Sequence, residues 1–486
     1  MNNSFACHAI PNTPGPFLVD GFKLHSPSTQ HYFLSHFHGD HYGGLKETFA
    51  AGVIYCTPTT RRLAINVLGV DPTRVIGIDF EQRTCIAGIY VTLFDANHCP
   101  GAALLQFELP NGTTHVHTGD FRFHPKMLQY HWKTPIDTIF LDTTYGKPKH
   151  VFLPQDEAIQ LGVDTCLDAS IRNNVPLHRT LFLIGAYNIG KEKLLLRIGK
   201  ELNVKIGVEK KKMNGHLTCL YPQVDVREQL FTTNHSDTNV HVCRMNYCGE
   251  MWPFFRPNFV NMATFLEQMN QVENKYDHIV GIIPTGWAAT TSWNREHAIT
   301  KKDNATVVLI SYSEHSSYEE LISFAKGMKP RHIEPIVFSD ANDRHAILNR
   351  FQAFVDRDAN KRKFFSMMSS GGLSGGRGSG KRSKTKMKSK TKSNQLKLTE
   401  NKTDCQDLTQ CLPQPTSAKL LLSSSSSSSS SSFSMSNTID VIDLSADTPP
   451  HPMLNSARRS TMKGSARRVS PIKKQQKLSF TTVAKQ

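Results

Sequence analysis

Short apolar runs alternate with polar loops along the chain up to about residue 364. Six runs are rich in β-branched or aromatic residues, which predicts strands. Each of the six leads directly to an acidic residue or a histidine: "FLVD" ends in Asp20, "HYFLS" precedes His36, "YVTLFDAN" precedes His98, "THVHTG" precedes Asp120, "DTIFLD" ends in Asp142 and "ATVVLISYSE" precedes His315. Because strands that end on such side chains deliver them to one edge of a sheet, the pattern predicts one site assembled from distant segments.

Helical spacing and turn signals lie between the predicted strands. Residues 157–175 and 315–330 have the apolar periodicity of helices, and residues 179–202 predict a strand, a glycine-containing turn and a helix. The segment "LPNGTTHV" contains Asn-Gly, which suits the turn between two antiparallel strands. The chain up to residue 364 is therefore expected to be an α/β protein.

The composition changes near residue 365. Residues 366–486 contain glycine- and lysine-rich stretches, ten consecutive serines and few aromatic residues. Such a segment cannot bury enough apolar surface to offset its chain entropy, so we predict that it is disordered. Residues 361–486 carry 23 Lys and Arg against 6 Asp and Glu, whereas residues 1–360 carry 34 against 35. A basic tail behind a nearly neutral folded part indicates a polyanion-binding arm or a nuclear address.

The cysteines and the hydropathy restrict the location of the protein. Ten cysteines are scattered without compact pairing spacings, which favours reduced thiols over a disulfide framework. No stretch approaches the roughly 18 apolar residues of a membrane helix, and no basic patch followed by an apolar run opens the chain. The sequence predicts an intracellular protein without a membrane partner.

The densest cluster of candidate ligands is "HFHGDH", which follows the apolar run "YFL". His36 and His38 are two positions apart, so on an extended segment both side chains project to one side. Gly39 then lets the backbone turn sharply before Asp40 and His41. Imidazoles and carboxylates are the ligands of zinc and similar cations. A single histidine is more often a surface or core residue, but the combined pattern predicts a metal site.

Two metal ions account for the number of candidate ligands. The loop offers four, and His98 and Asp120 bring the set above what one tetrahedral ion accepts. Two ions about 3.5–4 Å apart, bridged by a carboxylate and a hydroxide, resolve the surplus. Such a pair lowers the pKa of the bridging water and clamps the attacking and leaving oxygens of a phosphodiester. The expected chemistry is hydrolysis without a protein nucleophile.

Five segments resemble, in order, the signature blocks of the metallo-β-lactamase/β-CASP nucleases of the DNA cross-link repair group, the family of Artemis and Apollo. They are "HFHGDH", "DANHCPG", "HTGDFR", "LDTTY" and "SEHSSY". The resemblance is closest to the cross-link repair exonuclease branch. It implies a metallo-β-lactamase αββα sandwich with an inserted β-CASP domain. The expected domains are residues 1–155 and 301–365 for the two parts of the metallo-β-lactamase domain, 156–300 for the β-CASP domain and 366–486 for the tail.

The resemblance implies a first metal ion held by three histidines, namely His36, His38 and His98. It implies that Asp40 and His41 belong to a second ion and that Asp120 bridges the two. Zinc is the expected metal, with magnesium or manganese as the alternative at the second site.

Three more residues match the family. Asp142 and His315 match its first two β-CASP blocks, and both are expected to be catalytic together with Asp40 and Asp120. His315 would be either a ligand of the second ion or the group that protonates the leaving oxygen. Asp20 would orient a ligand histidine by accepting its far N–H.

Candidate DNA contacts come from two helix starts. "IGAYNIGKEK" supplies Tyr187, Lys191 and Lys193, where backbone amides and ammonium groups could hold a phosphate; the alternative is a solvated helix face. Ser316 and Ser317 open a helix beside the expected metal ions. They belong either to a 5′-phosphate pocket or to an ordinary helix N-cap.

Two other features of the sequence bear on the substrate and on a further metal. RNA-processing relatives place a histidine where "IEPIVF" has Val337, as DNA-directed members do, which argues for DNA. His241, Cys243 and Cys248 resemble part of a small zinc site in Artemis. Gly207 stands where a fourth ligand would be wanted, so we expect buried thiols instead.

The tail holds four candidate motifs. "KRSKTKMKSKTK" and "ARRVSPIKKQQK" resemble nuclear import signals, which predicts a location in the nucleus, with a nonspecific polyanion-binding arm as the alternative. "NTIDVIDLSAD", residues 437–447, resembles a SUMO-interacting segment that would add a strand to a partner sheet. "QQKLSF", residues 475–480, resembles a sliding-clamp-binding box, although Thr481 and Thr482 stand where two aromatic residues are usual.

The predicted function is a metal-dependent 5′–3′ DNA exonuclease in interstrand cross-link repair. Its expected substrates are single-stranded or duplex DNA ends and cross-linked DNA. The alternatives are a structure-specific endonuclease of the Artemis type, a small-molecule metallo-hydrolase and a noncatalytic repair scaffold. The insertion and Val337 weigh against the small-molecule enzyme, and the intact ligand set weighs against the scaffold.

Overall fold

The computed structural model describes residues 7–24, 29–251, 254–271, 274–288 and 290–356, together with Asp358 and Lys361. The predicted disordered tail and its four motifs lie outside these residues. Within the described part, every helix is too short or too polar to cross a bilayer.

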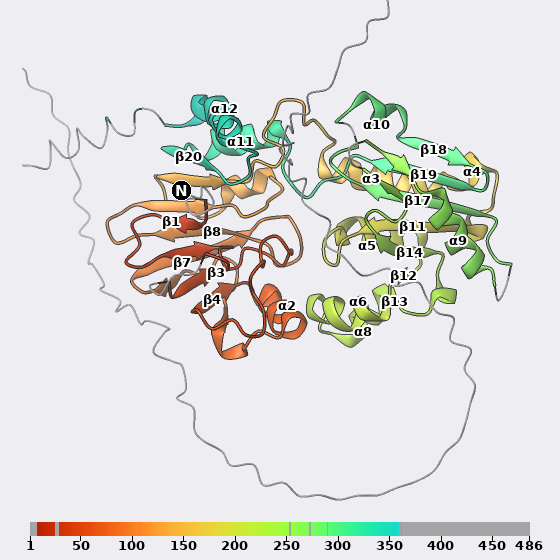
Figure 1. The fold of residues 1–486 in the computed structure, drawn as a ribbon, viewed down its shortest axis with the longest axis horizontal. Coiled ribbons are helices and arrows are strands. Elements are labelled where there is room, and N and C mark those ends of the chain that lie inside the picture. The colour runs from red at the N-terminus through yellow and green to blue at the C-terminus, as the bar shows by residue number, and fades with distance from the viewer. Residues whose placement is uncertain are drawn as a thin grey trace, which may run out of the picture. The chain divides into compact units, whose positions relative to one another are not determined.

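Two sheets are built from both ends of the described chain (Figure 1). The first has five strands in sequence order, parallel except for the β1–β2 pair. The second has six strands in the order β20-β10-β9-β8-β7-β6. The strands of the first sheet are β1 (Ala9–Ile10), β2 (Phe17–Val19), β3 (His31–Phe33), β4 (Val53–Cys56) and β5 (Val75–Gly77). Those of the second are β6 (Thr84–Ile86), β7 (Ile89–Asp95), β8 (Ala103–Glu108), β9 (Thr114–His117), β10 (Thr138–Leu141) and β20 (His332–Pro335).

A shared apolar core joins side chains of the two sheets. Phe33 from β3 meets Phe107 from β8 edge to face, with ring centroids 5.0 Å apart. Alternate residues of the strands supply this core because successive strand side chains point to opposite faces. The buried set includes Phe17, Val19, Tyr55, Val91, Leu93 and Leu105.

Helices cover the outer faces of this pair of sheets. α2 (Pro58–Leu68) packs beside β5, and α12 (Ala341–Phe351) packs beside β20, with α11 (Tyr318–Met328) nearby (Figure 1). α2 starts at Thr57, whose hydroxyl accepts the amide of Thr60. The layers are helix, sheet, sheet, helix, which confirms the predicted αββα sandwich.

The inserted domain holds a seven-stranded sheet in the order β13-β12-β14-β11-β17-β19-β18. All pairs are parallel except β18–β19. Its strands are β11 (Thr180–Ala186), β12 (Ile206–Gly207), β13 (Phe231–Thr232), β14 (Val240–Arg244), β17 (His278–Pro284), β18 (Ile299–Lys302) and β19 (Ala305–Ile310). A separate hairpin pairs β15 (Gly249–Glu250) with β16 (Arg256–Pro257).

Helices pack on both faces of the seven-stranded sheet. α3 (Gln155–Leu167) and α5 (Glu192–Leu202) share a buried core with Phe182 and Ile184 of β11, whereas α9 (Phe259–Met269) shares another with Leu181 and Leu183. The alternation along β11 explains the two cores, since neighbouring side chains face opposite layers. The remaining helices are α4 (Ala169–Asn173), α6 (Lys210–Lys212), α7 (Thr218–Leu220), α8 (Val224–Leu230) and α10 (Ser292–Glu296).

The sheet of the inserted domain continues past residue 300, where the sequence analysis ended this domain. Its last strand, β19, stops at Ile310, and β18 and β19 both belong to it. The β-branched run of β19 resembles a closing strand of the sandwich, but it pairs with β17 instead. That closing position belongs to β20, which pairs with β10.

Local predictions agree with the observed elements. α3 and α4 occupy the segment predicted as helix 157–175, and α11 lies within 315–330. β11 and α5 form the predicted strand and helix of residues 179–202. β8 and β9 form the predicted hairpin, in which Gly112 adopts a φ of 78°.

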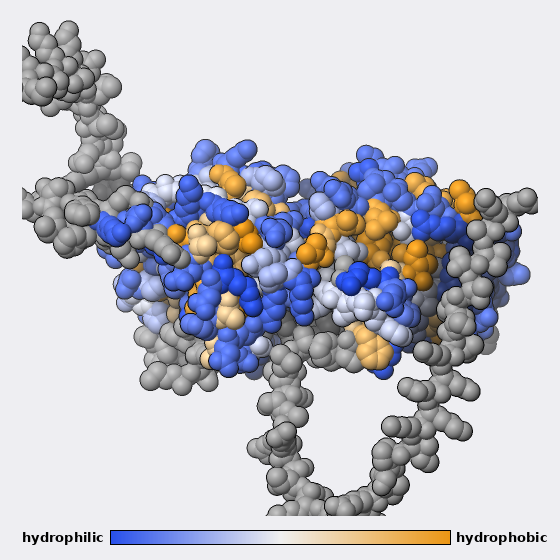
Figure 2. Space-filling view, turned by 90° about the horizontal axis from the view of Figure 1, so that it is seen from above, coloured by the Kyte–Doolittle hydropathy of each residue, from blue (hydrophilic) through white to orange (hydrophobic). Residues whose placement is uncertain are grey.

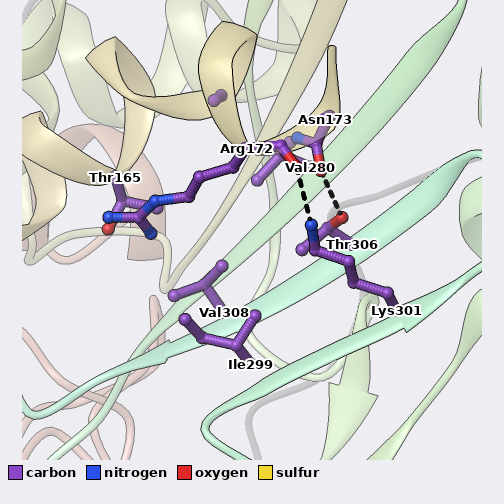
Figure 3. Close-up of a pocket in the computed structure, with 9 residues that line it drawn as sticks. Thr165, Arg172, Asn173, Val280, Ile299, Lys301, Thr306 and Val308 are labelled. Atoms are coloured by element: carbon purple, nitrogen blue, oxygen red, sulfur yellow. Dashed lines mark hydrogen bonds between the residues drawn. The ribbon is translucent and has the colours of Figure 1, made fainter. Parts of the chain in front are cut away.

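The surface of the inserted domain carries exposed apolar residues and more than one pocket, of which a small one lies beside α4. Figure 2 shows apolar residues in orange over this domain, and Leu167, Ile171 and Ile299 are among the exposed ones. The pocket lies between α4 and strands β18 and β19 (Figure 3), where Lys301 donates to the backbone oxygen of Arg172 at 3.0 Å. The described lining residues include none of the candidate metal ligands.

A buried histidine makes the stability of the fold depend on pH. Nε2 of His117 donates to Cys7 O at 3.1 Å, and Nδ1 accepts the amide of Gly119 at 3.0 Å, so the ring is neutral. Burial lowers the pKa of His117 from 6.5 to about 4. Its contribution to stability is complete above pH 6.5 and is lost as the pH falls through 4, at about 1.4 kcal/mol per pKa unit.

We expect His117→Gln to reduce the acid sensitivity of folding. Between pH 7 and pH 4 the free energy of unfolding of the unmodified protein should fall by about 3 kcal/mol more than that of the variant. Urea unfolding followed by circular dichroism at both pH values measures the difference. Equal losses in the two proteins would contradict a neutral, buried His117.

Candidate metal centre

The candidate ligands lie at strand ends of both sandwich sheets. His36 follows β3, His98 follows β7, and Asp120 follows β9. The chain approaches itself closely here: a Cβ on Gly119 would lie 2.6 Å from Cβ of Ser35, and the φ of Gly119 is 50°. Only glycine fits such a position, so the loop that carries Asp120 can lie against the loop that carries the histidines.

One group of ligand atoms is formed by His36, His38, His98 and Asp120, all within 4.8 Å of one another. Nδ1 of His38 is 3.0 Å from Nε2 of His36 and 3.1 Å from Nε2 of His98. Oδ2 of Asp120 is 3.6 Å from Nε2 of His36 and 3.7 Å from Nε2 of His98. Three ring nitrogens and one carboxylate oxygen therefore converge on one point.

A second group contains Asp40, His41 and Asp120, and a third contains Asp120, Asp142 and His315. Nε2 of His41 lies 3.1 Å from Oδ2 of Asp120 and 3.7 Å from Oδ2 of Asp40. Nδ1 of His315 donates to Asp142 at 2.9 Å, and its Nε2 lies 3.9 Å from Oδ2 of Asp120. Asp120 is thus common to these three groups, whereas a fourth group, formed by Asp20, His36 and His41, does not contain it.

The far nitrogens of two histidines are fixed by backbone carbonyls. Nε2 of His38 donates to Ile189 O at 3.2 Å, and Nδ1 of His98 donates to Glu314 O at 2.8 Å. Because a carbonyl can only accept, each ring carries its proton on the far nitrogen. The nitrogen that faces the group therefore has a free lone pair, as a metal ligand requires.

Asp20 orients two further histidines. Its carboxylate accepts the amide of Ser35 at 2.8 Å and the hydroxyl of Ser35 at 2.6 Å. The same carboxylate accepts from Nδ1 of His41 at 2.7 Å. Nδ1 of His36 lies 2.9 Å from the Ser35 hydroxyl, whose own hydrogen is used by Asp20. This geometry is the one that the expected role of Asp20 requires, and Ser35 is a relay that the sequence analysis missed.

The electrostatics differ between the two halves of the cluster. Burial lowers the pKa of His36, His38 and His98, which favours neutral rings. Burial also acts on His41 and His315, but the surrounding carboxylates outweigh it, raising the pKa of His41 well above its ordinary value and that of His315 to about 9. The three neutral imidazoles can therefore bind one metal cation. The carboxylates around His41 and His315 favour a positive charge beside them, either a protonated ring or a second metal cation.

The donor set fits divalent metal ions. Inward lone pairs on fixed, neutral imidazoles together with a carboxylate are the ligands of a borderline cation. Asp40, His41 and Asp120 on the other side offer oxygen and nitrogen donors for a second ion that would share Asp120. Such ions polarise a bound oxygen and lower the pKa of water.

Arg122 braces the cluster and was missed by the sequence analysis. Its side chain is fully buried, and it donates to Ser313 O at 2.7 Å, to Leu153 O at 2.9 Å and to Glu320 at 3.1 Å. These bonds connect the loop after Asp120 to the segment that precedes His315. An arginine two residues after a ligand was the available signal, but its partners are distant in sequence.

The candidate DNA contacts in the inserted domain differ in exposure. Tyr187 is 36% exposed, and its ring centroid lies 6.3 Å from that of His38. Lys191 is buried, and its ammonium group lies 3.3 Å from Glu314. Lys193 bonds side-chain amide oxygens, and burial lowers its pKa. Tyr187 is therefore accessible, whereas Lys191 is already paired within the protein.

Both candidate serines have internal partners. The Ser316 hydroxyl donates to Phe121 O at 2.8 Å and accepts the amide of Phe123 at 2.9 Å. Ser317 caps α11, and Glu320 completes a capping box. These bonds favour the helix-cap alternative, and a phosphate contact of either hydroxyl stays a prediction.

The second candidate zinc site does not assemble among the described residues. Sγ of Cys243 lies 3.9 Å from Sγ of Cys248, and both thiols are buried. Nε2 of His241 bonds Thr238 O at 3.0 Å. A Cβ at Gly207 would lie 2.3 Å from Nδ1 of His241, so this ring already fills the place of the missing ligand. Cys243 and Cys248 are buried free thiols in this structure.

The sandwich, the inserted domain and the ligand cluster define the class as a metallo-β-lactamase-type protein. The family described as DNA repair metallo-beta-lactamase matches residues 225–341. A DNA cross-link repair protein SNM1 of Arabidopsis thaliana is 31% identical over 72% of this chain and 70% of its own length. The chain belongs to this DNA cross-link repair metallo-β-lactamase family.

Two other relatives are matched over only part of their own length. DNA ligase 6 of Arabidopsis thaliana is 38% identical over 73% of this chain, but the match covers only 25% of the ligase. The 5' exonuclease Apollo of Gallus gallus is 31% identical over 68% of this chain and 63% of its own length. The chain therefore spans about a quarter of the first of these relatives.

Removal of one candidate ligand should lower the metal content. We expect His38→Ala to lose at least one bound divalent ion per chain after dialysis, because two imidazole nitrogens and one carboxylate hold an ion more weakly than the full set. Elemental analysis measures the ratio of metal to protein. The exposed His345 provides the control, since His345→Ala should keep the full content. Equal metal content in both variants would contradict the proposed ligand set.

Replacement of Arg122 should destabilise the protein. Arg122→Met leaves two buried carbonyls without their donor and removes the arginine partner of Glu320, which keeps the amide of Ser317, so the free energy of unfolding should fall by about 3 kcal/mol. The pair of Arg83 and Glu108, in which the arginine side chain is half exposed, offers a control, and Arg83→Met should cost less than about 1 kcal/mol. Urea unfolding of the metal-loaded proteins gives both values. A loss for Arg122→Met no larger than that of the control would show that Arg122 is not a brace.

Proposed function

We propose that the protein is a metal-dependent DNA nuclease that hydrolyses phosphodiesters from the 5′ end during interstrand cross-link repair. The observation that carries this proposal is the sharing of Asp120 between the histidine group and the group of Asp40 and His41. A carboxylate common to two ligand groups suits two neighbouring divalent ions, the arrangement that serves phosphoryl hydrolysis. Zinc is the proposed metal, because imidazole dominates the first group.

The side chains of the centre divide the work of binding and proton transfer. Bound divalent ions would supply an activated water and a clamp on the phosphate oxygens. Asp20 holds His41 through Nδ1, and Asp142 holds His315 in the same way, so both rings present Nε2 to the cluster. With its outer nitrogen fixed by Asp142, His315 can hold a proton at Nε2 for the departing oxygen or serve as a further ligand.

DNA is the proposed substrate for two reasons. The relatives include proteins named for DNA cross-link repair and a 5′ exonuclease. Val337 stands where RNA-processing relatives have a histidine, and it is tied to the Asp142 loop by the bond from Thr143 Oγ1 to Val337 O at 2.6 Å. The same reasons support action in the nucleus. SUMO and a sliding clamp remain proposed partners of the tail.

An assay on end-labelled oligonucleotides tests the proposal. The purified chain is incubated with single-stranded, blunt duplex and hairpin DNA, each with a 5′-phosphate or a 5′-hydroxyl. We expect successive loss of nucleotides from the 5′ end, abolished by a chelator and restored by zinc. Asp120→Asn should lower the rate by at least a hundredfold, because it weakens both metal sites at once.

The products distinguish the alternatives. Opening of the hairpin without stepwise shortening would favour a structure-specific endonuclease of the Artemis type. An unchanged substrate together with hydrolysis of a small ester would favour a metallo-hydrolase. If no substrate were cleaved and cells that express Asp120→Asn tolerated cross-links normally, the chain would be a scaffold. Exposed Asp358→Asn is the matched control for the loss of a carboxylate.

A further inference from the structure

Two partly exposed aromatic side chains flank the candidate metal centre. Tyr187 is 36% exposed beside His38, as described above, and Trp287 is 37% exposed. Trp287 is connected to the centre through Tyr145: the Tyr145 ring lies 6.0 Å from that of His315 and 5.3 Å from that of Trp287. The indole therefore lies within a nucleotide or two of a phosphate at the centre.

Two buried aromatic rings pack against the Trp287 ring. Tyr145 and His150 are both buried and lie beside it, with ring centroids 5.3 and 5.9 Å from that of Trp287. A Cβ at Gly286 would lie 2.5 Å from the Tyr145 hydroxyl, so glycine lets this tyrosine pack beneath the loop. Asn294 donates to Trp287 O at 2.9 Å and holds the backbone. The indole thus packs against two buried rings and remains partly exposed to solvent.

The hydrogen bonding of the indole N–H distinguishes Trp287 from Trp132 and Trp293. Trp132 donates its Nε1 hydrogen to Met127 O at 2.7 Å, and Trp293 donates to Phe255 O at 2.9 Å. In the part of the chain that the structure describes, the Trp287 indole has no such acceptor. The Trp287 N–H is therefore not used in packing and is available to solvent or to a ligand.

We propose that Trp287 is a stacking platform for a nucleobase of the DNA strand whose phosphate lies at the metal centre, with Tyr187 as a second platform on the His38 side. This inference rests on the proposed function and adds the form of the substrate. Stacking on an aromatic ring uses the face that every base possesses, so it tolerates any sequence. It requires a base that has left its own stack, so the centre would bind unpaired or frayed ends in preference to closed duplex.

The experiment combines protein variants with base deletions. Single-stranded 5′-phosphorylated oligonucleotides carry one tetrahydrofuran abasic residue at successive positions from the 5′ end. For the metal-loaded protein, we expect one position at which the abasic residue raises KM roughly tenfold while kcat changes little, the size expected for one stacked base. Trp287→Leu should raise KM to the same extent on intact DNA and should be indifferent to the abasic residue there.

Two matched variants complete the design. Trp287→Phe retains a ring and should keep most of the affinity, which separates stacking from damage to the fold. Trp293→Leu removes another partly exposed tryptophan of the same domain and should leave KM and the abasic profile unchanged. The proposal would be overturned if the Trp287→Leu and abasic penalties added, or if Trp287→Phe behaved like Trp287→Leu.

A binding measurement keeps this inference separate from the proposed function. Fluorescence anisotropy with phosphorothioate-protected oligonucleotides reports affinity without turnover. Binding that depends on Trp287 in a protein that cleaves no DNA would refute only the nuclease. Cleavage with wild-type KM in Trp287→Leu would refute only the stacking platform.

Discussion

The hydrogen bonds behind the ligand histidines are the constraint on which the centre depends. An imidazole binds a cation only through a nitrogen without a proton, so its tautomer has to be fixed from the far side. For His38 and His98 the fixing carbonyls belong to Ile189 and Glu314, on the inserted domain and on the loop that leaves it. The backbone of the inserted domain and of the loop that leaves it therefore fixes the tautomer of histidines on the sandwich.

Two buried basic side chains, Arg122 and Lys191, hold the loop that leads from the inserted domain back to the sandwich. Arg122 bonds the backbone of Ser313, and Lys191 pairs with Glu314 next to it. A buried ion pair adds little net stability, because desolvation offsets its attraction, but it penalises any other arrangement of the loop. These pairs therefore fix where His315 stands in relation to Asp120 more than they strengthen the fold.

Many residues of the candidate centre could be predicted because the end of a strand can be recognised from a short stretch of sequence. An apolar run followed by an acid or a histidine marked Asp20, His98, Asp120 and His315 as candidates, and the strand ends place each of them in a group of possible ligands. Their roles stay predictions. What the sequence analysis missed depends on contacts distant in sequence. The partner of Lys191 lies more than a hundred residues away, and the end of the inserted domain depended on which neighbour β19 would choose. Neither the partner of Lys191 nor the pairing of β19 can be predicted from residue type alone.

Strand β20 determines when this protein can finish folding as it is synthesised. It pairs with β10, although the whole inserted domain lies between them in the chain, and α11 and α12 come from the same late segment. While the ribosome is still translating the inserted domain, one edge of β10 and an apolar sheet face stay uncovered, the kind of surface that chaperones recognise and that aggregates capture. A nascent chain at that stage already contains the histidine loop but lacks His315 and the carbonyl of Glu314. The complete candidate metal centre can therefore form only after residue 315 has been made, and a chain that stopped within the inserted domain would expose apolar surface.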